Sequence, residues 1–389
     1  MRSITIVGAS LAGLSAARAL RALSYDGRIV VVGDEKHEPY DRPPLSKDFL
    51  TGKATTADLT LSTEDDEKLD LDWRLGATAV WLDPGRRAVG LDSGEELISD
   101  GVVLATGARA RTLRGSAVVD VHTLRSLDDA LALRADLQAG GPVVVIGAGF
   151  IGAEVASSAR ALGLDVTVVE ARPTPLEEPL GQEMGAQVAA LHTDHGTRLI
   201  TGVGVVGLVG GSRVRAVRLA DGRELPAATV VVGIGATPNV EWLAGSGLEL
   251  GPGVRTDAWC TTTIPGVVAV GDCASSYNRF AGEVVRLEHW TNAVQQPEIA
   301  AAALLGERSP TRPAAPYFWS DQYGVRLQFA GHRRAGDVVE VVDGDVDARS
   351  FTAVYRRGER PVAVLSVNQP KLFGRLRRQL AVPESEVVG

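Results

Sequence analysis

Two segments about 140 residues apart each join an apolar, β-branched run to a glycine-rich turn and an alanine-rich stretch. The first spans Ile4 to Gly13, and the second spans Val143 to Gly152. Each pattern predicts a β-strand that enters a tight turn and leaves it as a helix. In such a turn, backbone N–H groups and the helix N-terminus can approach a pyrophosphate, whose charge the helix dipole favours. Two such turns predict two bound dinucleotides in one chain, and hence electron transfer between them.

The second turn has the complete glycine pattern, with Gly147, Gly149 and Gly152. Glu170 follows the last glycine by about 20 residues, the position suited to accept the hydroxyl groups of a ribose. A negative charge there disfavours a 2′-phosphate, which predicts NADH rather than NADPH. Arg172 lies nearby and weakens this preference, because an arginine can hold a phosphate.

The first turn departs from the pattern, because Ser10 stands where the middle glycine belongs. A Cβ there lies where the backbone must approach the phosphates, so the hydroxyl either hydrogen-bonds a phosphate or crowds the turn. The acidic residue expected about 20 residues further on is Asp34 or Glu35. Taken alone, one turn of this kind is equally well explained as a strand–helix connection. Two matched copies favour nucleotide binding.

The composition is that of a globular α/β protein with two or three domains. The 389 residues are 45% hydrophobic and 23% charged, and no apolar run reaches the ~18 residues of a membrane span. The first strand begins by Ile4, which leaves no room for a signal peptide, so we expect a cytoplasmic protein that does not bind a membrane. The net charge of −8 argues against nucleic acid as a partner.

The sequence predicts neither a metal centre nor a disulfide framework. Its two cysteines, Cys260 and Cys273, lack the spacing of metal ligands. His192 and His195 have helical spacing without a third ligand, and we expect them on a solvated helix face.

Positive charge collects towards the C-terminus. Residues 306–389 contain 13 lysines and arginines against 10 acidic residues, although the whole chain is acidic. Arg375, Arg377 and Arg378 cluster behind a turn expected at residues 373–374. This cluster is either a solvated helix face or a docking patch for an acidic protein.

The chain divides into units that repeat one plan. Residues 1–108 end in an apolar run and a Thr-Gly turn, and residues 109–236 repeat this arrangement. The proline-containing stretch 306–316 is expected to be a linker. Beyond it, several strand-like runs and a basic helix predict a small α+β domain packed on the nucleotide-binding body.

Several motifs together resemble one family of flavoenzymes. Two of them, YDRPPLSK at 40–47 and WSDQ at 319–322, are the most specific. The others lie at 32–35, 104–108, 122–125, 147–154, 232–235, 269–272 and 367–368. Over essentially its whole length the chain resembles the FAD-containing, NADH-dependent ferredoxin reductases of the glutathione-reductase-like fold. This family includes putidaredoxin and rubredoxin reductases and the reductase components of aromatic-ring dioxygenases.

The resemblance implies an α/β fold with two Rossmann-like domains and a small α+β C-terminal domain. The NAD-binding domain would interrupt the FAD-binding domain. We therefore expect an FAD-binding domain made of residues 1–108 and 237–312, an NAD-binding domain at 109–236 and a C-terminal domain at 313–389.

The resemblance also implies a pair of catalytic residues, Lys47 and Glu154. They would form an ion pair beside the flavin and over the nicotinamide site, where they orient both rings. Electron transfer from NADH needs the two rings close together with little water between them, and no general acid or base is required. Without the family context, Lys47 would be interpreted as a solvated loop lysine.

The remaining site residues follow from the two turns and from the resemblance. Asp272 would accept a hydrogen bond from the ribityl chain, or alternatively cap a helix. The helix expected to open near Trp290 would direct its N-terminus at the flavin. The cofactor contacts expected on the flavin side are Gly8, Ser10, Leu11, Ala12, Gly13, Asp34, Glu35, Arg42, Lys47, Val80, Ala105, Thr106, Gly107, Arg125, Gly271, Asp272, His289 and Trp290. Those expected on the nicotinamide side are Gly147, Gly149, Phe150, Ile151, Gly152, Glu154, Glu170, Gly233, Ile234, Gly235 and Glu288. Trp319 is expected near the flavin or the nicotinamide, or as an ordinary core aromatic.

Related enzymes of this fold reduce disulfides through a cysteine pair, but here Pro39 and Pro44 occupy the matching positions. The resemblance therefore implies electron flow from NADH to FAD and then, in single steps, to an acidic iron–sulfur ferredoxin. That ferredoxin would feed a cytochrome P450 or a ring-hydroxylating dioxygenase, and the arginine cluster would dock it. Two alternatives are an NADH oxidase or quinone or dye reductase without a protein acceptor, and a redox-sensing FAD/NADH charge-transfer protein. The oligomeric state is left open.

Overall fold

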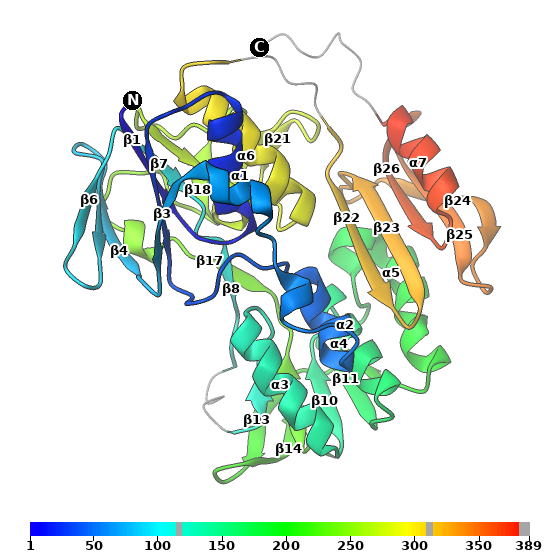
Figure 1. Ribbon diagram of the computed structural model, residues 1–389. Coiled ribbons are helices and arrows are strands. Elements are labelled where there is room, and N and C mark those ends of the chain that lie inside the picture. Colours follow the sequence, from blue (N-terminus) through cyan, green and yellow to red (C-terminus); the bar gives the residue numbers. More distant parts are fainter. Residues whose placement is uncertain (114–118, 309–313, 381–389) are drawn as a thin grey trace.

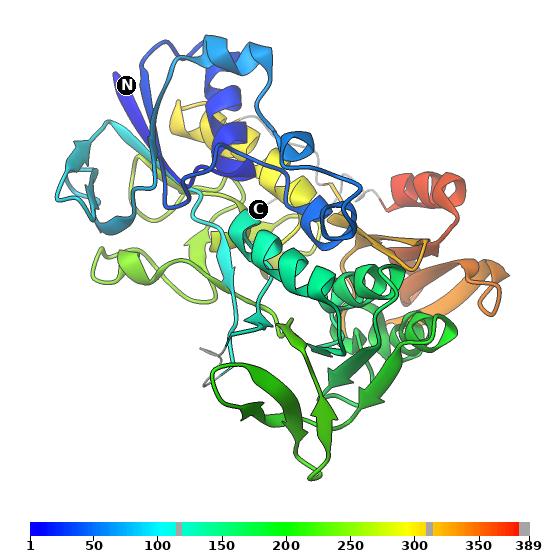
Figure 2. The ribbon, with the colours of Figure 1, turned by 60° about the horizontal axis from the view of Figure 1, so that its bottom comes forward.

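Three five-stranded sheets organise the computed structural model, which describes residues 1–113, 119–308 and 314–380. Figure 1 shows one sheet with its helices near the N-terminus, a second in the green segment below it, and a third in the orange and red C-terminal segment. Figure 2, turned by 60°, shows the same three bodies, with the short helix α2 (Asp48–Thr51) near the middle of the view. No helix among the described residues is both long enough and apolar enough to cross a membrane.

The first sheet is parallel, and its strands other than the edge strand Leu71–Leu75 are buried apolar runs, because helices or a second layer cover both faces. Its strands, in spatial order, are β19 (Val267–Ala269), β7 (Gly101–Leu104), β1 (Ser3–Val7), β2 (Arg28–Gly33) and β3 (Leu71–Leu75). On one face lie the two helices α1 (Leu11–Ala22) and α6 (Trp290–Leu304), packed through alanines and leucines. The other face is covered by a small antiparallel sheet of β4 (Ala79–Asp83), β5 (Ala88–Leu91) and β6 (Glu96–Ile98).

The second sheet repeats this plan with later parts of the chain. Its strands are β12 (Arg198–Thr201), β11 (Val166–Glu170), β10 (Val143–Ile146), β16 (Thr229–Val232) and β9 (Val121–His122), and all neighbours pair in parallel. Helices α3 (Leu127–Ala139) and α4 (Phe150–Ala161) cover one face. The antiparallel strands β13 (Val205–Gly210), β14 (Val214–Leu219) and β15 (Glu224–Pro226) cover the other.

The chain leaves the first sheet after β7, builds the second sheet, and returns to supply β19. The outgoing and returning segments are β8 (Ala108–Ala110) and β17 (Ala236–Pro238), which pair antiparallel with Ala110 opposite Ala236. After β17, a three-stranded sheet forms from β18 (Val254–Thr256), β20 (Ala274–Asn278) and β21 (Glu283–Val285).

The C-terminal sheet is antiparallel and sandwiched between two helices. Its strands are β22 (Tyr317–Gln322), β23 (Val325–Gly331), β26 (Arg360–Val367), β25 (Ser350–Arg357) and β24 (Val338–Asp345). One face packs on α5 (Glu177–Asp194) of the second unit, and the other on α7 (Pro370–Gln379).

The structure confirms the predicted fold class, including the insertion of one Rossmann-like unit into the other. The domain boundaries stay a prediction, and the boundary between residues 312 and 313 lies outside the described residues. One expectation on local structure is wrong: residues 373–374 form no turn but lie inside α7. In addition, the strand β22 was not predicted from the sequence.

Candidate functional site

The two glycine turns have the same geometry. Gly8 has a φ of +123° and Gly147 a φ of +100°, values that favour glycine. A Cβ at Gly8 would lie 2.0 Å from the Ala105 carbonyl oxygen, and one at Gly147 would lie 2.2 Å from that of Gly233. The first turn is thus pressed against the end of β7, and the second against the end of β16. No side chain larger than hydrogen fits at either position.

The last glycine of each turn lets the following helix approach its strand. A Cβ at Gly13 would meet the Gly8 carbonyl oxygen at 1.8 Å, and one at Gly152 would meet that of Gly147 at 2.1 Å. The middle glycine, Gly149, is different, because a Cβ there would meet no protein atom within 4 Å. The space next to Gly149 is therefore open, as the approach of a diphosphate requires.

Ser10 occupies the matching middle position of the first turn and is the N-cap residue of α1. Its Oγ makes no capping bond to the helix but accepts a hydrogen bond from Arg42 Nε at 3.3 Å. Arg42 also donates to the Arg125 carbonyl oxygen and forms an ion pair with Glu35, to which Tyr40 donates as well. The proline-rich loop is thus tied to the first turn and to the acid that follows β2.

The acidic residue after the second turn is placed differently. Glu170, at the end of β11, accepts a hydrogen bond on Oε2 from the Ala148 N–H at 2.9 Å, inside the glycine turn. Its Oε1 accepts one from the Arg172 N–H at 3.0 Å. The carboxylate is therefore held at the edge of the turn, where a bound ribose would meet it. The Arg172 guanidinium points to Glu178 at 3.5 Å, on an exposed surface.

Lys47 and Glu154, from distant parts of the chain, form an ion pair in which the lysine is partly buried and the glutamate is buried. Lys47 Nζ lies 2.7 Å from Glu154 Oε2, and the two side chains are 20% and 3% exposed. Lys47 follows the short helix η1 (Pro43–Ser46), and Glu154 lies on the first turns of α4, past the last glycine. Lys47 Nζ also donates to the Pro43 carbonyl oxygen at 3.0 Å. The lysine is therefore fixed both by the proline-containing loop and by the carboxylate.

Polar contacts connect the ends of β7 and β19 to the returning chain. Asp272 accepts a hydrogen bond from Arg125 at 2.7 Å, and the Arg125 Nε donates to the Ala108 carbonyl oxygen. The Gly271 N–H donates to Gln296 on α6. Thr106 and Asn239 exchange hydrogen bonds of 2.7 and 3.0 Å.

Aromatic side chains gather where α6 begins. Trp290 opens the helix, donates from Nε1 to Asp41 at 2.8 Å, and lies edge-on to Trp319, with 6.0 Å between ring centroids. His289 precedes it as the N-cap residue, and burial lowers the pKa of His289 to about 4. Its Nδ1 is buried without a hydrogen-bond partner among the described residues. This nitrogen is therefore available to a bound group.

The remaining predicted residues are spread around these centres. Val80 is 42% exposed on β4, and Ile151 is 47% exposed at the start of α4. Glu288 forms an ion pair with Arg286, whose guanidinium also donates to the Asp272 carbonyl oxygen. Trp319 lies on β22, stacked against Tyr317. Ion pairs or hydrogen bonds between side chains join Lys47 with Glu154, Ser10 with Arg42, Arg42 with Glu35, and Arg125 with Asp272, and a ring contact joins Trp290 with Trp319.

Sequence reasoning missed three polar residues at this site. Ser46 Oγ donates to Glu154 Oε2 at 2.5 Å, and Ser320 Oγ donates to Glu154 Oε1 at 2.6 Å. Asp41 is the acceptor for Trp290, and burial raises its pKa. Ser46 and Ser320 lie within the two motifs that carry the family resemblance most specifically, which is the signal that could have found them.

The histidine expectation is wrong for one of the two residues. His192 is 2% exposed, and burial lowers its pKa to about 4. Its Nδ1 lies 2.8 Å from the Tyr323 hydroxyl, and the ring of His195 stacks on the Tyr323 ring. Tyr323 forms the turn between β22 and β23. His192 thus lies under a C-terminal hairpin rather than on a solvated face, whereas His195 is exposed, as expected.

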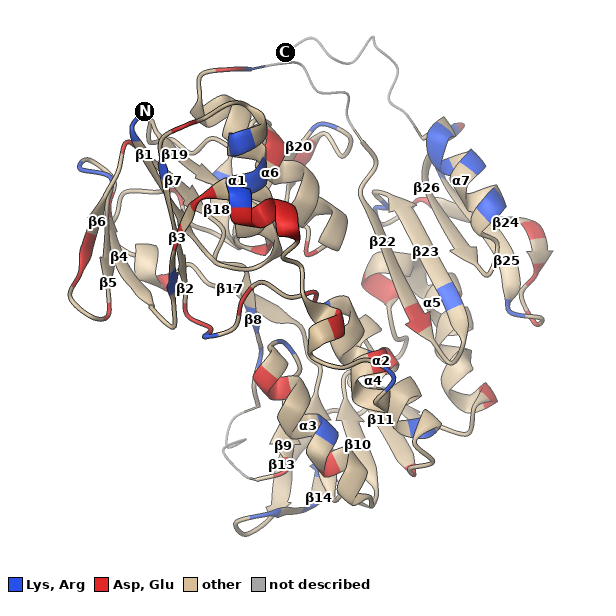
Figure 3. Cartoon of the chain, in the orientation of Figure 1, with Lys and Arg blue, Asp and Glu red and all other residues tan. Residues whose placement is uncertain are grey.

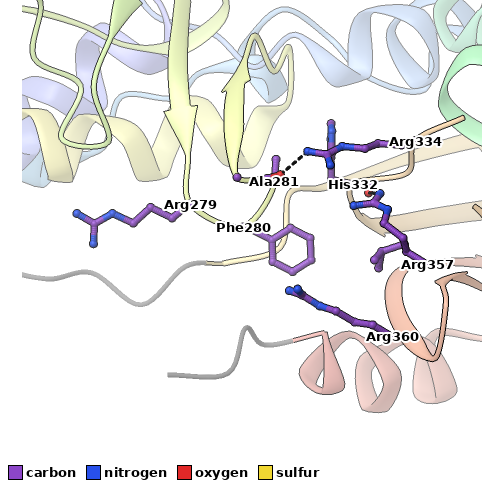
Figure 4. Close-up of a pocket in the computed structure, with 9 residues that line it drawn as sticks. Arg279, Phe280, Ala281, His332, Arg334, Arg357 and Arg360 are labelled. Atoms are coloured by element: carbon purple, nitrogen blue, oxygen red, sulfur yellow. Dashed lines mark hydrogen bonds between the residues drawn. The ribbon is translucent and has the colours of Figure 1, made fainter. Parts of the chain in front are cut away.

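A positively charged pocket of about 170 Å³ lies apart from these centres. Figure 4 shows Arg334, Arg357 and Arg360 of the C-terminal domain around it, whereas Arg279, between β20 and β21, points away from them. It is lined by Arg279, Phe280, Ala281, Gly282, His332, Arg334, Arg357, Arg360 and Val362. Phe280 belongs to the same hydrophobic cluster as Phe373 and Leu380, so the pocket borders α7.

These observations fit two dinucleotides and no thiol relay. The open space at Gly149 leaves room for a bound group, and His289 Nδ1, which has no hydrogen-bond partner in the described part of the chain, can accept a bond from one. Cys260 and Cys273 are both buried, and burial raises the pKa of Cys260 to about 12. A thiol with so high a pKa is a poor electron relay at neutral pH.

Comparison with known proteins identifies relatives over nearly the whole chain. Residues 2–297 match the family of pyridine nucleotide-disulphide oxidoreductases, and residues 317–385 match the reductase C-terminal family. Rhodocoxin reductase of Rhodococcus erythropolis is 39% identical over 97% of this chain and 89% of its own. The ferredoxin–NAD(+) reductase component of the biphenyl dioxygenase system of Paraburkholderia xenovorans is 40% identical over 89% of this chain and 85% of its own.

A solved structure shares the fold. The reductase in the covalent putidaredoxin reductase–putidaredoxin complex superimposes with a TM-score of 0.93 at 35% identity. The alignment covers 98% of this chain and 93% of that one.

Proposed function

The chain belongs to the pyridine nucleotide-disulphide oxidoreductase family, and from this premise we propose that it is an FAD-containing, NADH-dependent ferredoxin reductase. Its partner is an acidic iron–sulfur ferredoxin that supplies a cytochrome P450 or a ring-hydroxylating dioxygenase. When bound, FAD accepts an electron pair from NADH and passes the electrons on one at a time. A cytoplasmic location stays a prediction from the sequence.

The observation that carries this proposal is the Lys47–Glu154 ion pair between the two glycine turns. Glu154 lies on the helix that opens at the second turn, and Lys47 lies on the loop that Arg42 ties to the first turn. The pair is largely shielded from water, which strengthens its electrostatic effect on whatever lies beside it. We propose that it orients the nicotinamide against the flavin.

Other residues bind and hold the two dinucleotides. The turns at Gly8 and Gly147 offer backbone N–H groups and helix N-termini to the diphosphates. Glu35 and Glu170 serve the two riboses, and Asp272 serves the ribityl chain. The N-terminus of α6, which begins at His289 and Trp290, places the positive end of the helix dipole near the flavin ring. Because Pro39 and Pro44 stand where related enzymes have a cysteine pair, electrons pass from the flavin directly to an outside acceptor.

The acceptor is proposed to dock on the face formed by α7. Figure 3 shows a series of basic residues along this helix. Arg375 and Arg378 are exposed, whereas Arg377 is half-buried, with its guanidinium 4.3 Å from the centre of the Tyr317 ring. Tyr317 in turn stacks on Trp319, which contacts Trp290. The basic face thus borders the aromatic side chains at the start of α6, and the pocket of Figure 4 extends it.

The test is anaerobic addition of NADH to the purified protein, followed by a ferredoxin. We expect yellow protein whose visible flavin bands bleach with NADH and return when ferredoxin is added. Lys47→Met should slow the bleaching at least about tenfold, the equivalent of about 1.4 kcal/mol. The matched control is Lys53→Met, a change of an exposed lysine on the same segment, which should behave as wild type.

Three outcomes would contradict the proposal. Protein that contains no flavin and cannot be reconstituted with FAD would exclude the whole scheme. Rapid reaction of the reduced enzyme with oxygen and no gain from ferredoxin would indicate an NADH oxidase or quinone reductase. Very slow turnover with a ligand-dependent change of oligomeric state would indicate a redox sensor.

A further inference from the structure

The Glu154 carboxylate, on α4, is bound by two other parts of the chain. Its Oε2 accepts hydrogen bonds from Lys47 at 2.7 Å and from Ser46 at 2.5 Å, both on the proline-rich loop. Its Oε1 accepts one from Ser320 Oγ at 2.6 Å, on β22 of the C-terminal sheet. Among the described residues, Ser320 is the one hydrogen-bond partner that the structure gives to Oε1.

The contact lies in a dry environment. Glu154 is 3% exposed and Ser320 is fully buried. Gln322, also buried, donates to Ser320 Oγ at 3.1 Å, which leaves the Ser320 hydroxyl hydrogen free to point at the carboxylate. Hydrogen bonds to a buried charge are stronger than ordinary ones, and leaving such a charge short of a donor is costly.

The surrounding packing holds the two elements in register. Phe150 at the start of α4 contacts Phe318 on β22, with 4.8 Å between the ring centroids. The Tyr323 N–H, at the end of the same strand, donates to Ser157 on α4 at 2.7 Å. Ser320 therefore approaches Glu154 from a strand that is anchored to α4 on both sides of the contact.

We propose that Ser320 is a positioning residue for the Lys47–Glu154 pair. By holding Oε1, it fixes the rotation of the carboxylate so that Oε2 faces Lys47. The C-terminal domain thus takes part in orienting the nicotinamide against the flavin, in addition to docking the acceptor. This inference rests on the proposed function, because that function assigns the pair its place beside the flavin.

The matched control is Ser366, on β26 of the same sheet. Ser366 is 1% exposed, and its Oγ is buried without a hydrogen-bond partner among the described residues. Ser320→Ala and Ser366→Ala therefore remove the same atom from equally buried positions of one domain. They differ in whether that atom contacts Glu154. Thermal unfolding of both variants monitors any general loss of structure.

The experiment measures anaerobic flavin reduction by NADH, NAD+ affinity and the visible flavin spectrum. For Ser320→Ala we expect reduction to slow about tenfold, while the dissociation constant of NAD+ stays within about twofold. Its visible absorption band should move in the same direction as that of Glu154→Gln. Ser366→Ala should match wild type in all three measurements.

A double variant tests whether Ser320 acts through Glu154. In the Glu154→Gln background, Ser320→Ala should slow reduction by less than about twofold, because the group it orients is already changed. An additional tenfold loss there, or wild-type behaviour of Ser320→Ala alone, would overturn the inference. Wild-type protein that NADH cannot reduce would instead overturn the proposed function, so the two failures are distinguishable.

Discussion

At the scale of single residues, the two acids that follow the glycine turns have different partners. Glu35 is bound by the Tyr40 hydroxyl and the Arg42 guanidinium, so its charge is neutralised by a neighbour. Glu170 is bound by the backbone N–H groups of Ala148 and Arg172, so its full charge remains at the edge of the turn. Glu170 is therefore the residue that we expect to discriminate between NADH and NADPH.

Glu170→Gln should reduce this discrimination. The amide keeps an oxygen for the Ala148 N–H but loses the charge that repels a 2′-phosphate. We expect the ratio of kcat/KM for NADPH to that for NADH to rise about tenfold, equivalent to about 1.4 kcal/mol. Steady-state kinetics with both cofactors measure this ratio. Glu183→Gln, an exposed change on α5, is the control, and an unchanged ratio in Glu170→Gln would contradict the role of charge.

At the scale of an element, α7 has two functions on its two faces. Phe373 and Leu380 pack into the C-terminal sheet, whereas Arg375 and Arg378, three residues apart, lie together on the exposed face. Arg377 lies between these faces and covers Tyr317. The three arginines that the sequence grouped together are therefore not equivalent.

Replacing Arg375 and Arg378 with glutamate should weaken ferredoxin binding without damaging the nucleotide sites. We expect the KM for ferredoxin to rise at least about tenfold and its salt dependence to become shallower, because rim charges act mainly on association. NADH–ferricyanide activity should be unchanged. Arg218→Glu on the distant strand β14 is the control. Equal loss of both activities would show that these arginines stabilise the domain instead of docking the partner.

At the scale of the whole molecule, the C-terminal hairpin is fastened to the NAD unit through His192. The folded-state pKa of His192 is about 4, below the 6.5 of an unperturbed histidine. The unfolded chain therefore binds the proton more readily, and stability falls as the pH drops from about 6.5 to about 4. Over this pH range, the buried His192 lowers the free energy of unfolding by about 3 kcal/mol in total.

His192→Gln should flatten the acid side of the stability profile. Glutamine removes the titration but can still hydrogen-bond the Tyr323 hydroxyl. We expect the loss of Tm between pH 7.5 and pH 5 to be smaller in this variant than in wild type, as measured by thermal unfolding of the flavin-loaded protein. His37→Gln serves as the control, because His37 lies near the surface beside Asp128. Parallel profiles for His192→Gln and wild type would contradict this prediction.

The architecture could be predicted from the sequence because the pattern that marks each nucleotide-binding unit lies within a short segment. The apolar runs around Ile4 and Val143 are followed at once by their glycine turns, so strand, turn and helix appear within about 15 residues. By contrast, buried and exposed residues do not alternate regularly along β22, since four of its six residues are partly buried. His192 was misjudged because the face that buries it belongs to a sheet more than 100 residues away, as a separation of 131 residues to Tyr323 shows.

Only those site residues that lie within recognisable motifs could be predicted from the sequence. The Lys47–Glu154 pair came from the resemblance, because the two residues are 107 positions apart and no local pattern joins them. Ser320 is 166 positions from Glu154 and needed three-dimensional structure to be found.

The pairing of β8 with β17 has a mechanical consequence. Both links to the inserted unit run through one two-stranded strap, in which Ala108 lies opposite Pro238. Because the outgoing and returning links are hydrogen-bonded to each other, we expect any hinge motion of the inserted unit to bend both links together. The Lys47–Glu154 ion pair crosses the boundary between the two nucleotide units at a second place, so a bend of this kind would pull on it.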